Sequence, residues 1–194
     1  INGTVGANTV WQNVGLPYIV ENQSGVDRDG VLTIEPGVEV RFAQNASFDV
    51  GGTLLAVGTP DQPIRFTGTQ AQAGWWQGLR LDSERGYAEL RYCDIGYGGS
   101  EGQPLVEIAA SATFMTQCRI HDGGGPGIVI GPNVQPSLAY NRIEANAQGL
   151  VALDPVDARY NWWGDASGPQ HTTNPSGAGQ LIVGDVQFSP WLTS

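Results

Sequence analysis

The sequence predicts an all-β solenoid, and three observations support this fold class. A short phrase occurs four times, as LRYCDI, MTQCRI, LAYNRI and ARYNWW, at spacings of 25, 23 and 20 residues. A period of this length is typical of solenoids, in which each repeat buries its apolar side only against its neighbours. The apolar runs are short, alternate with polar residues and end at Gly, Pro or Asn, as strands do. No run has helical periodicity between caps, which excludes repeats that carry helices.

The chain divides into three regions of one domain. Residues 1–30 are the least regular and are expected to form an N-terminal arm or cap, with short strands in NTVWQNV and PYIVENQ. Residues 31–163 are expected to form the coils, beginning with the strand–turn–strand unit VLTIEPGVEVRF. Residues 164–194 start with a loop rich in Gly, Pro, Ser and Asn and finish with LIVGDVQFSPWL, so we expect a closing strand or cap there.

The repeated phrases resemble those of right-handed parallel β-helix proteins, the pectin-lyase-like superfamily. The run LTIEPGVEVRF…GGTLLAVGTPDQPIRF is similar to the opening coils of secreted bacterial members, and YNWWGDASGP with GDVQFSPWLTS is similar to their closing segment. The resemblance implies about six or seven coils of three short strands each. It does not imply a function, because the superfamily includes lyases, hydrolases, adhesins and inert scaffolds.

One position of the repeat is expected to form a ladder. In the resembled family a turn position carries a stack of Asn or small polar residues, and Cys93, Cys118, Asn141 and Asn161 match it. Neighbouring members would lie at the strand spacing of about 4.8 Å. A disulfide between Cys93 and Cys118 is sterically allowed at that distance, but we expect two stacked, buried thiols.

Composition excludes several classes of partner and mechanism. Nine Arg against nineteen Asp and Glu give a net charge of −10, so nucleic acid and anionic membranes are not expected partners. The chain contains no Lys, which excludes Schiff-base chemistry. No apolar run approaches the roughly 20 residues of a membrane span.

Equal offsets from the ladder place one imidazole among carboxylates. His121 and Glu144 should lie one coil apart, flanked by Asp122 and, two coils from it, Asp165. Such a cluster could perform acid–base catalysis or bind a cation, so these four residues are the candidate catalytic residues. The alternative is a solvated row of turn residues.

Two further acids are candidate metal ligands through the family resemblance. Asp154 and Asp157, followed by Arg159, resemble in outline the calcium-binding acids and basic residue of pectate lyases, and are candidate metal ligands. The three close Asp residues of polygalacturonases have no counterpart. We expect no cofactor.

Two tandem tryptophan pairs suggest sugar binding. Neighbours on a strand point to opposite faces, so one Trp of each pair should be exposed. Trp162 is the exposed candidate of its pair, because Trp163 replaces the buried Ile of the repeat, and Trp76 is the candidate of the other pair. Capping of an end coil is the alternative role.

The expected function is that of a secreted, non-enzymatic structural or adhesive module. The first residue is Ile1 rather than Met, as in a processed product. Open strand edges and a β-prone N-terminal arm favour self-association, including head-to-tail filaments. The alternative is a polysaccharide-active lyase or hydrolase, or a carbohydrate-binding module, with extracellular glycans as partners. Sequons at Asn2, Asn22 and Asn45 are possible glycosylation sites.

Overall fold

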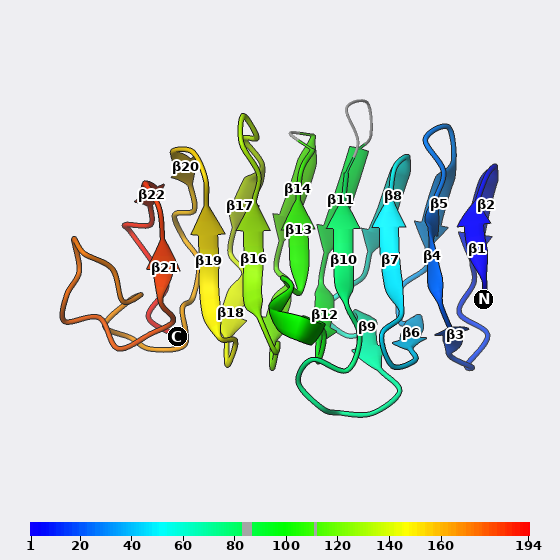
Figure 1. Cartoon of the computed structure of the whole chain (residues 1–194), viewed down its shortest axis with the longest axis horizontal. Coiled ribbons are helices and arrows are strands. Elements are labelled where there is room, and N and C mark those ends of the chain that lie inside the picture. The colour runs from blue at the N-terminus through cyan, green and yellow to red at the C-terminus, as the bar shows by residue number, and fades with distance from the viewer. Residues whose placement is uncertain (83–86, 111) are drawn as a thin grey trace.

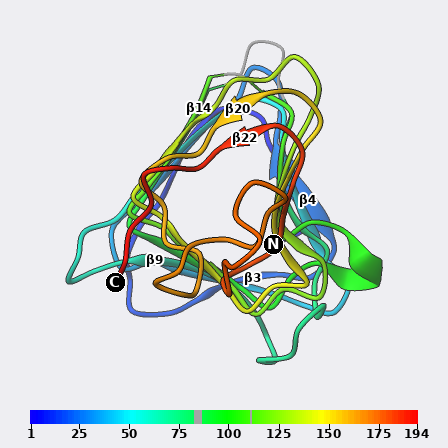
Figure 2. The ribbon, with the colours of Figure 1, turned by 90° about the vertical axis from the view of Figure 1, so that its left-hand side faces the viewer.

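The structure, a computed structural model, describes residues 1–82, 87–110 and 112–194. Three parallel sheets form the sides of a triangular solenoid (Figures 1 and 2). Sheet A contains β1 (Gly3–Val5), β4 (Gln23–Val26), β7 (Ser47–Val50), β10 (Gly78–Leu81), β13 (Val106–Ile108), β16 (Pro126–Ile130), β19 (Gln148–Ala152) and β21 (Ile182–Val183). Sheet B contains β2 (Asn8–Trp11), β5 (Val31–Ile34), β8 (Thr53–Val57), β11 (Tyr87–Arg91), β14 (Thr113–Thr116) and β17 (Ser137–Ala139). Sheet C contains β3 (Tyr18–Val20), β6 (Glu39–Phe42), β9 (Ile64–Gly68), β12 (Cys93–Gly96), β15 (Arg119–His121) and β18 (Arg142–Glu144).

The chain passes through sheets A, B and C in turn and returns to sheet A one coil further along. Sheets B and C have six strands each, which gives six complete coils, and the winding is right-handed (Figures 1 and 2). These findings confirm the predicted fold class. The 3₁₀ turn η1 (Ser100–Gly102) is the one helical element in the described part of the chain, where no helix could span a membrane.

The apolar positions of the repeated phrase stack in register inside the solenoid. One column contains Leu90, Met115 and Leu138 in sheet B, and another contains Ile95, Ile120 and Ile143 in sheet C. All six side chains are buried, as predicted. Each coil therefore buries its apolar face against the coils above and below, which is the source of stability in a solenoid.

From Tyr92 onward, the turn that follows each sheet B strand, or the equivalent strand β20 (Val156–Asp157), has one residue in the left-handed conformation, whereas the three earlier corners are loops of four to six residues. These residues, called here the corner row, are Tyr92, Gln117, Tyr140 and Tyr160, with φ between 49° and 62°. Each directly precedes a ladder residue, because the left-handed turn redirects the chain so that the next side chain points inward. Side chains other than Gly, Asn and Asp rarely adopt this conformation.

The predicted ladder is present and is held by hydrogen bonds between coils. The Cys118 amide donates to Asn141 Oδ1 (3.0 Å), and the Asn141 amide donates to Asn161 Oδ1 (2.9 Å). The Asn141 Nδ2 group donates to the carbonyl of Met115 at 2.9 Å. Cys93 and Cys118 are free and buried, and burial raises the pKa of the Cys93 thiol.

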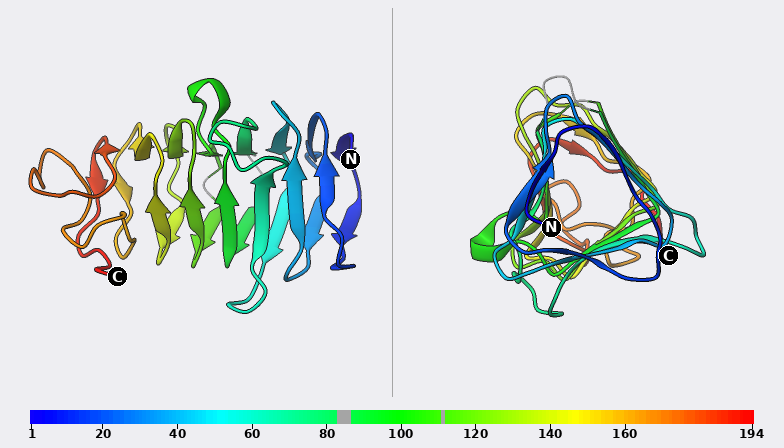
Figure 3. Two further views of the ribbon diagram at one scale, coloured as in Figure 1. Left: turned by 90° about the horizontal axis from the view of Figure 1, so that it is seen from below. Right: turned by 90° about the vertical axis from the view of Figure 1, so that its right-hand side faces the viewer.

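The N-terminal region forms the first coil rather than a separate arm. Its strands β1, β2 and β3 pair in register with β4, β5 and β6, and they are the end strands of the three sheets (Figure 3). Trp11 fills the interior of this coil, where its ring stacks on Tyr18 at 4.9 Å between centroids. The residues expected to form an arm or cap are thus part of the solenoid.

The C-terminal end is covered by irregular chain. After the short strand β20 (Val156–Asp157), residues 164–181 cross the end of the solenoid before β21 extends sheet A and β22 (Val186–Gln187) pairs with β20. The Gln180 amide donates to the carbonyl of Trp163, which is fully buried. Figure 1 shows this segment beyond the last strands.

The ladder predicts a specific cost for removing one amide. Replacing Asn141 with Leu leaves the buried Cys118 amide and the carbonyl of Met115 without their partners, so Asn141→Leu should lower the free energy of unfolding by about 2–4 kcal/mol. Cys118→Ala, which removes only a weak donor and a small volume, should cost about 1 kcal/mol. Urea denaturation monitored by circular dichroism measures both, and equal effects would contradict a structural role for the amide.

Candidate functional site

The candidate site lies on the outer face of sheet C. Strand pairing places side chains in two outward rows: one contains Asp94, Arg119 and Arg142, and the other contains Gly96, His121 and Glu144. The predicted register is confirmed, since His121 and Glu144 lie on adjacent coils. Because all of these residues are fixed by strand pairing, their positions depend on the backbone ladder rather than on loop conformation.

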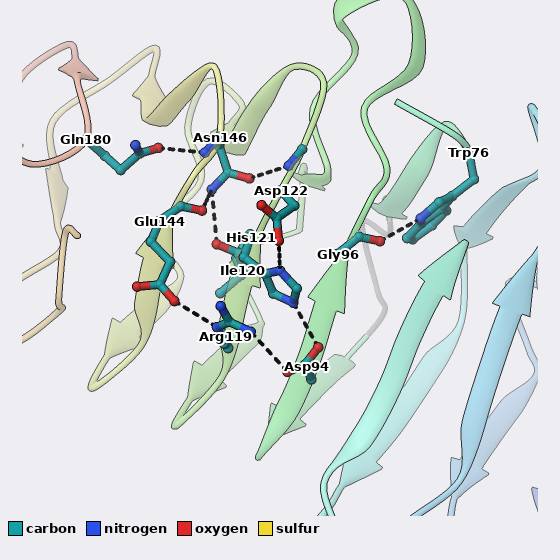
Figure 4. Close-up of polar contacts among 11 residues, drawn as sticks. Trp76, Asp94, Gly96, Arg119, Ile120, His121, Asp122, Glu144, Asn146 and Gln180 are labelled. Atoms are coloured by element: carbon teal, nitrogen blue, oxygen red, sulfur yellow. Dashed lines mark hydrogen bonds and ion pairs between the residues drawn. The ribbon is translucent and has the colours of Figure 1, made fainter. Parts of the chain in front are cut away.

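Both ring nitrogens of His121 are bonded to carboxylates (Figure 4). Its Nδ1 lies 2.7 Å from Asp122 Oδ2 and its Nε2 lies 2.9 Å from Asp94 Oδ1. The ring packs over Gly96, where an added Cβ would lie 2.7 Å from the imidazole Cε1. Glycine therefore leaves the space that the ring occupies, and the side chain is only 5% exposed.

This arrangement favours the imidazolium form of His121. A neutral imidazole has one donor, so two bonds to ionised carboxylates require both nitrogens to be protonated. Burial opposes the charge, but the hydrogen bonds to Asp94 and Asp122 outweigh it and raise the pKa of His121 above its ordinary value. Burial likewise opposes ionisation of Asp94, yet the hydrogen bond and charge of His121, with the charge of Arg119, hold the Asp94 pKa below its ordinary value.

Arg119 and Glu144 extend the network along the solenoid axis. Arg119 Nε lies 2.8 Å from Glu144 Oε1, and its guanidinium lies 3.9 Å from Asp94. Arg142 lies 3.5 Å from Glu144 and 5.3 Å above the ring of Trp162, whose Nε1 donates to Glu144. Burial opposes ionisation of Glu144, but the bonds from Arg119 and Trp162 lower its pKa.

The charges of this network cancel. Three cations, Arg119, His121 and Arg142, face three carboxylates, those of Asp94, Asp122 and Glu144. Each carboxylate has at least one cationic partner and each cation has at least one acid. A general base must be able to accept a proton near neutral pH, and the raised pKa of His121 lowers the fraction of its neutral form there. The ion pairs of the network join one coil to the next.

The other predicted site residues are not part of this cluster. Asp165 accepts hydrogen bonds from the amide and hydroxyl of Ser167, which lower its pKa. Asp154 accepts from the Asn133 amide, whereas Asp157 forms an ion pair with Arg159. Among residues 1–82, 87–110 and 112–194, no group of three or more His, Cys, Asp and Glu side chains comes together as a metal site.

The expected exposure of Trp76 is wrong, whereas Trp162 is partly exposed as expected and its sugar-binding role stays a prediction. Trp76 is completely buried, stacks on Phe42 at 3.9 Å and donates from Nε1 to the carbonyl of Gly96, so it is a core residue and not a sugar platform. It lies between a loop and β10, where strand alternation does not yet apply. Trp162 is partly exposed on sheet C, and Trp163 is buried as predicted.

A second side-chain amide at the next corner was not predicted. The Asn146 side chain accepts a hydrogen bond from the backbone amide of Gly123 and donates one to the carbonyl of Ile120. The backbone amide of Asn146 donates to the side-chain oxygen of Gln180 (Figure 4). The equivalent positions of the two preceding coils are Gly123 and Gly98, so the sequence carries no repeated amide there. Only the offset from the ladder could have indicated it.

Comparison with known proteins adds little about the site. No family model matches the chain, and no solved structure matches it. An 84-residue stretch is 32% identical to Protein bark beetle of Drosophila melanogaster and covers 43% of this chain. The similar stretch is only 3% of that protein's length, so its activity and partners cannot be transferred to this chain.

The His121 network predicts a stability that depends on pH. Because the folded-state pKa of His121 is raised, its contribution is complete below the unfolded value of about 6.5 and is lost as the pH rises through the folded value. The lowered pKa of Asp94 means that its contribution is complete above about 3.9 and is lost as the pH falls below that.

We therefore expect His121→Gln to destabilise the protein by about 1–3 kcal/mol at pH 5.5 and by less at pH 9. Urea unfolding at both values measures the difference. His171→Gln is the control, because His171 bonds to the Thr173 hydroxyl and the Gly184 carbonyl instead of carboxylates. A destabilisation by His121→Gln that is equal at the two pH values would contradict the imidazolium assignment.

Proposed function

We propose that the chain is a non-enzymatic structural module, a rigid β-solenoid that acts outside the cell as a spacer or adhesive surface. The observation that carries the proposal is that both ring nitrogens of His121 are hydrogen-bonded to carboxylates, so neither is left for a substrate. The ion pairs, the ladder and the core all join one coil to the next. A rod with these contacts keeps its two ends at a fixed separation, which is what a spacer requires.

The extracellular assignment has separate support. The side chains of Asn2, Asn22 and Asn45 are exposed, so all three sequons are accessible to a glycosyltransferase in a secretory pathway. Similarity of one stretch to a small part of a much longer protein is also what a module would display.

An enzymatic role is the alternative, and it predicts a measurable turnover. A lyase or hydrolase acting through His121 would release unsaturated or reducing ends from polysaccharides. We expect no product above that of heat-denatured protein when polygalacturonate, alginate, xylan and glucan are incubated with the chain and both kinds of end are assayed. Turnover that is lost in His121→Gln, in a variant that remains folded, would overturn the non-enzymatic proposal.

The first coil supports self-association as part of this function. Its strands β1, β2 and β3 present the outer edges of sheets A, B and C. Several large apolar side chains are exposed in the same coil: Ile1, Val10, Val14, Leu16 and Ile19. Open edges flanked by apolar side chains favour pairing with another strand. The opposite end presents two-residue strands and an irregular crossing segment, so the first coil is the better contact surface.

Self-association through the first coil predicts that a single lysine on its edge strand weakens the association. Sedimentation velocity should show a concentration-dependent increase in mass for the unmodified chain. Val10→Lys, on edge strand β2, should reduce it at least tenfold in association constant, because an edge lysine opposes strand pairing. Phe114→Lys, a control on the outer face of β14 with similar exposure, should leave it unchanged. A monomer at every concentration, or equal effects of the two variants, would contradict association through this coil.

A further inference from the structure

The corner between sheets B and C carries a groove that the network of charges does not explain. Its volume is about 210 Å³, and it extends over three coils. Three kinds of side chain line it: corner-row residues Tyr92, Gln117 and Tyr140; the outward sheet C residues Asp94, Arg119 and Arg142; and, at one end, prolines of the 58–63 loop. Backbone bonds fix that loop against the corner, since the Ile64 amide donates to the carbonyl of Tyr92.

The choice of residues in the corner row points to a role for the side chains. Four of the six tyrosines in the chain, Tyr92, Tyr97, Tyr140 and Tyr160, have positive φ. Glycine or asparagine adopts this conformation at lower cost, and a bulky residue held there costs of the order of 1 kcal/mol or more. Tyrosine at three of the four corner positions is therefore not selected for the turn itself.

The corner row has a gap in its aromatic surface. The rings of Tyr140 and Tyr160 stack at 5.7 Å with 17° between their planes. Tyr92 and Tyr140 are two coils apart, about 9.6 Å by the strand spacing, with the non-aromatic Gln117 between them. A ring held between two aromatic faces needs about 7–8 Å, which is two contact distances. This spacing would accommodate one pyranose ring stacked over the exposed Gln117 side chain.

The polar side of the groove fits a hydroxyl-rich ligand. Arg119 and Arg142 are 45% and 47% exposed, yet both are fixed by Glu144. With Asp94 they present fixed donors and an acceptor beside the tyrosines, and fixed groups lose little entropy on binding. Vicinal hydroxyls can pair with a guanidinium or a carboxylate, while the C–H face of a sugar ring packs on an aromatic ring.

Charge decides which sugars fit. Two arginines, Arg119 and Arg142, and one carboxylate, that of Asp94, line the groove, but Glu144 pairs with both arginines and offsets their charge, and the chain as a whole carries −10. An anionic glycan would gain little at the groove and would be repelled by the rest of the molecule. We propose that the groove between Tyr92 and Tyr140 binds a neutral oligosaccharide, with one ring in the gap above Gln117 and its hydroxyls toward Asp94, Arg119 and Arg142.

Isothermal titration calorimetry of the full chain tests this proposal. The probes are soluble neutral oligosaccharides of the gluco, manno, xylo and galacto series, with polygalacturonate and heparin fragments as acidic counterparts. We expect saturable binding of at least one neutral series and weaker binding of the acidic ones. No saturable binding of any neutral series, or tighter binding of an acidic one, would overturn the proposal.

Three variants locate the site. Tyr140→Asn should weaken binding about tenfold or more while the fold is retained, because Asn adopts the left-handed conformation readily. Gln117→Tyr should also abolish binding, since it fills the gap with a side chain that the same turn accepts in neighbouring coils. Phe114→Asn is the matched control, because Phe114 is about as exposed as Tyr140 (45% and 48%) but lies on sheet B outside the groove. Unchanged binding in both groove variants, or equal loss in the control, would overturn the assignment of the site.

Discussion

In the second half of the solenoid, the alignment of each coil on the next depends on the turn between sheets B and C. From Tyr92 onward, one left-handed residue connects the two sheets and a ladder residue follows it. The inward amides of Asn141 and Asn161 bond to the backbone of the preceding coils, so the turn is held from inside as well as by strand pairing. If this corner moved by one residue, every side chain of sheet C would exchange its inner for its outer position. The core columns, the ion-pair network and the tyrosine groove all require that it does not.

Several features of the fold could be predicted because equal offsets in a solenoid stack vertically. The repeat alone predicts the buried columns that contain Leu90 and Ile95, and it predicts the ladder. It also predicts that His121 and Glu144 occupy equivalent positions on adjacent coils. The partner of His121 did not follow, because a side chain leans along its strand and Nε2 reaches Asp94 on the preceding coil. Trp76 was misplaced since it precedes a strand rather than lying within one, and Asn146 has no counterpart in the earlier coils. A repeat predicts the features that recur in every coil. It does not predict the direction in which one side chain leans along its strand, or a residue that occurs in a single coil.

The charges of sheet C contrast with those of the whole molecule. Four of the nine arginines, Arg41, Arg65, Arg119 and Arg142, belong to strands of this sheet in a chain with net charge −10. On parallel strands, like charges in one row would repel each other at the coil spacing. The row instead alternates through Glu39, Arg65, Asp94 and Arg119, and the charge of Arg142 is balanced by Glu144 in the adjacent row. Balance of this kind allows a densely charged face to stabilise the solenoid rather than to strain it.

The different lengths of the connections determine where the gene can tolerate insertions. One residue joins β11 to β12, whereas nine residues, including η1, separate β12 from β13. Insertions or deletions at the second kind of corner alter a surface loop and leave both neighbouring sheets in register, as the unequal repeat lengths of 25, 23 and 20 residues already indicate. At the single-residue corner, even one inserted residue would exchange the inward and outward side chains of the following sheet C strand. Homologous chains should therefore vary in length at the exits from sheets A and C and keep a constant length at the corners after β11, β14 and β17, whereas the corners after β2, β5 and β8 are already loops of four to six residues.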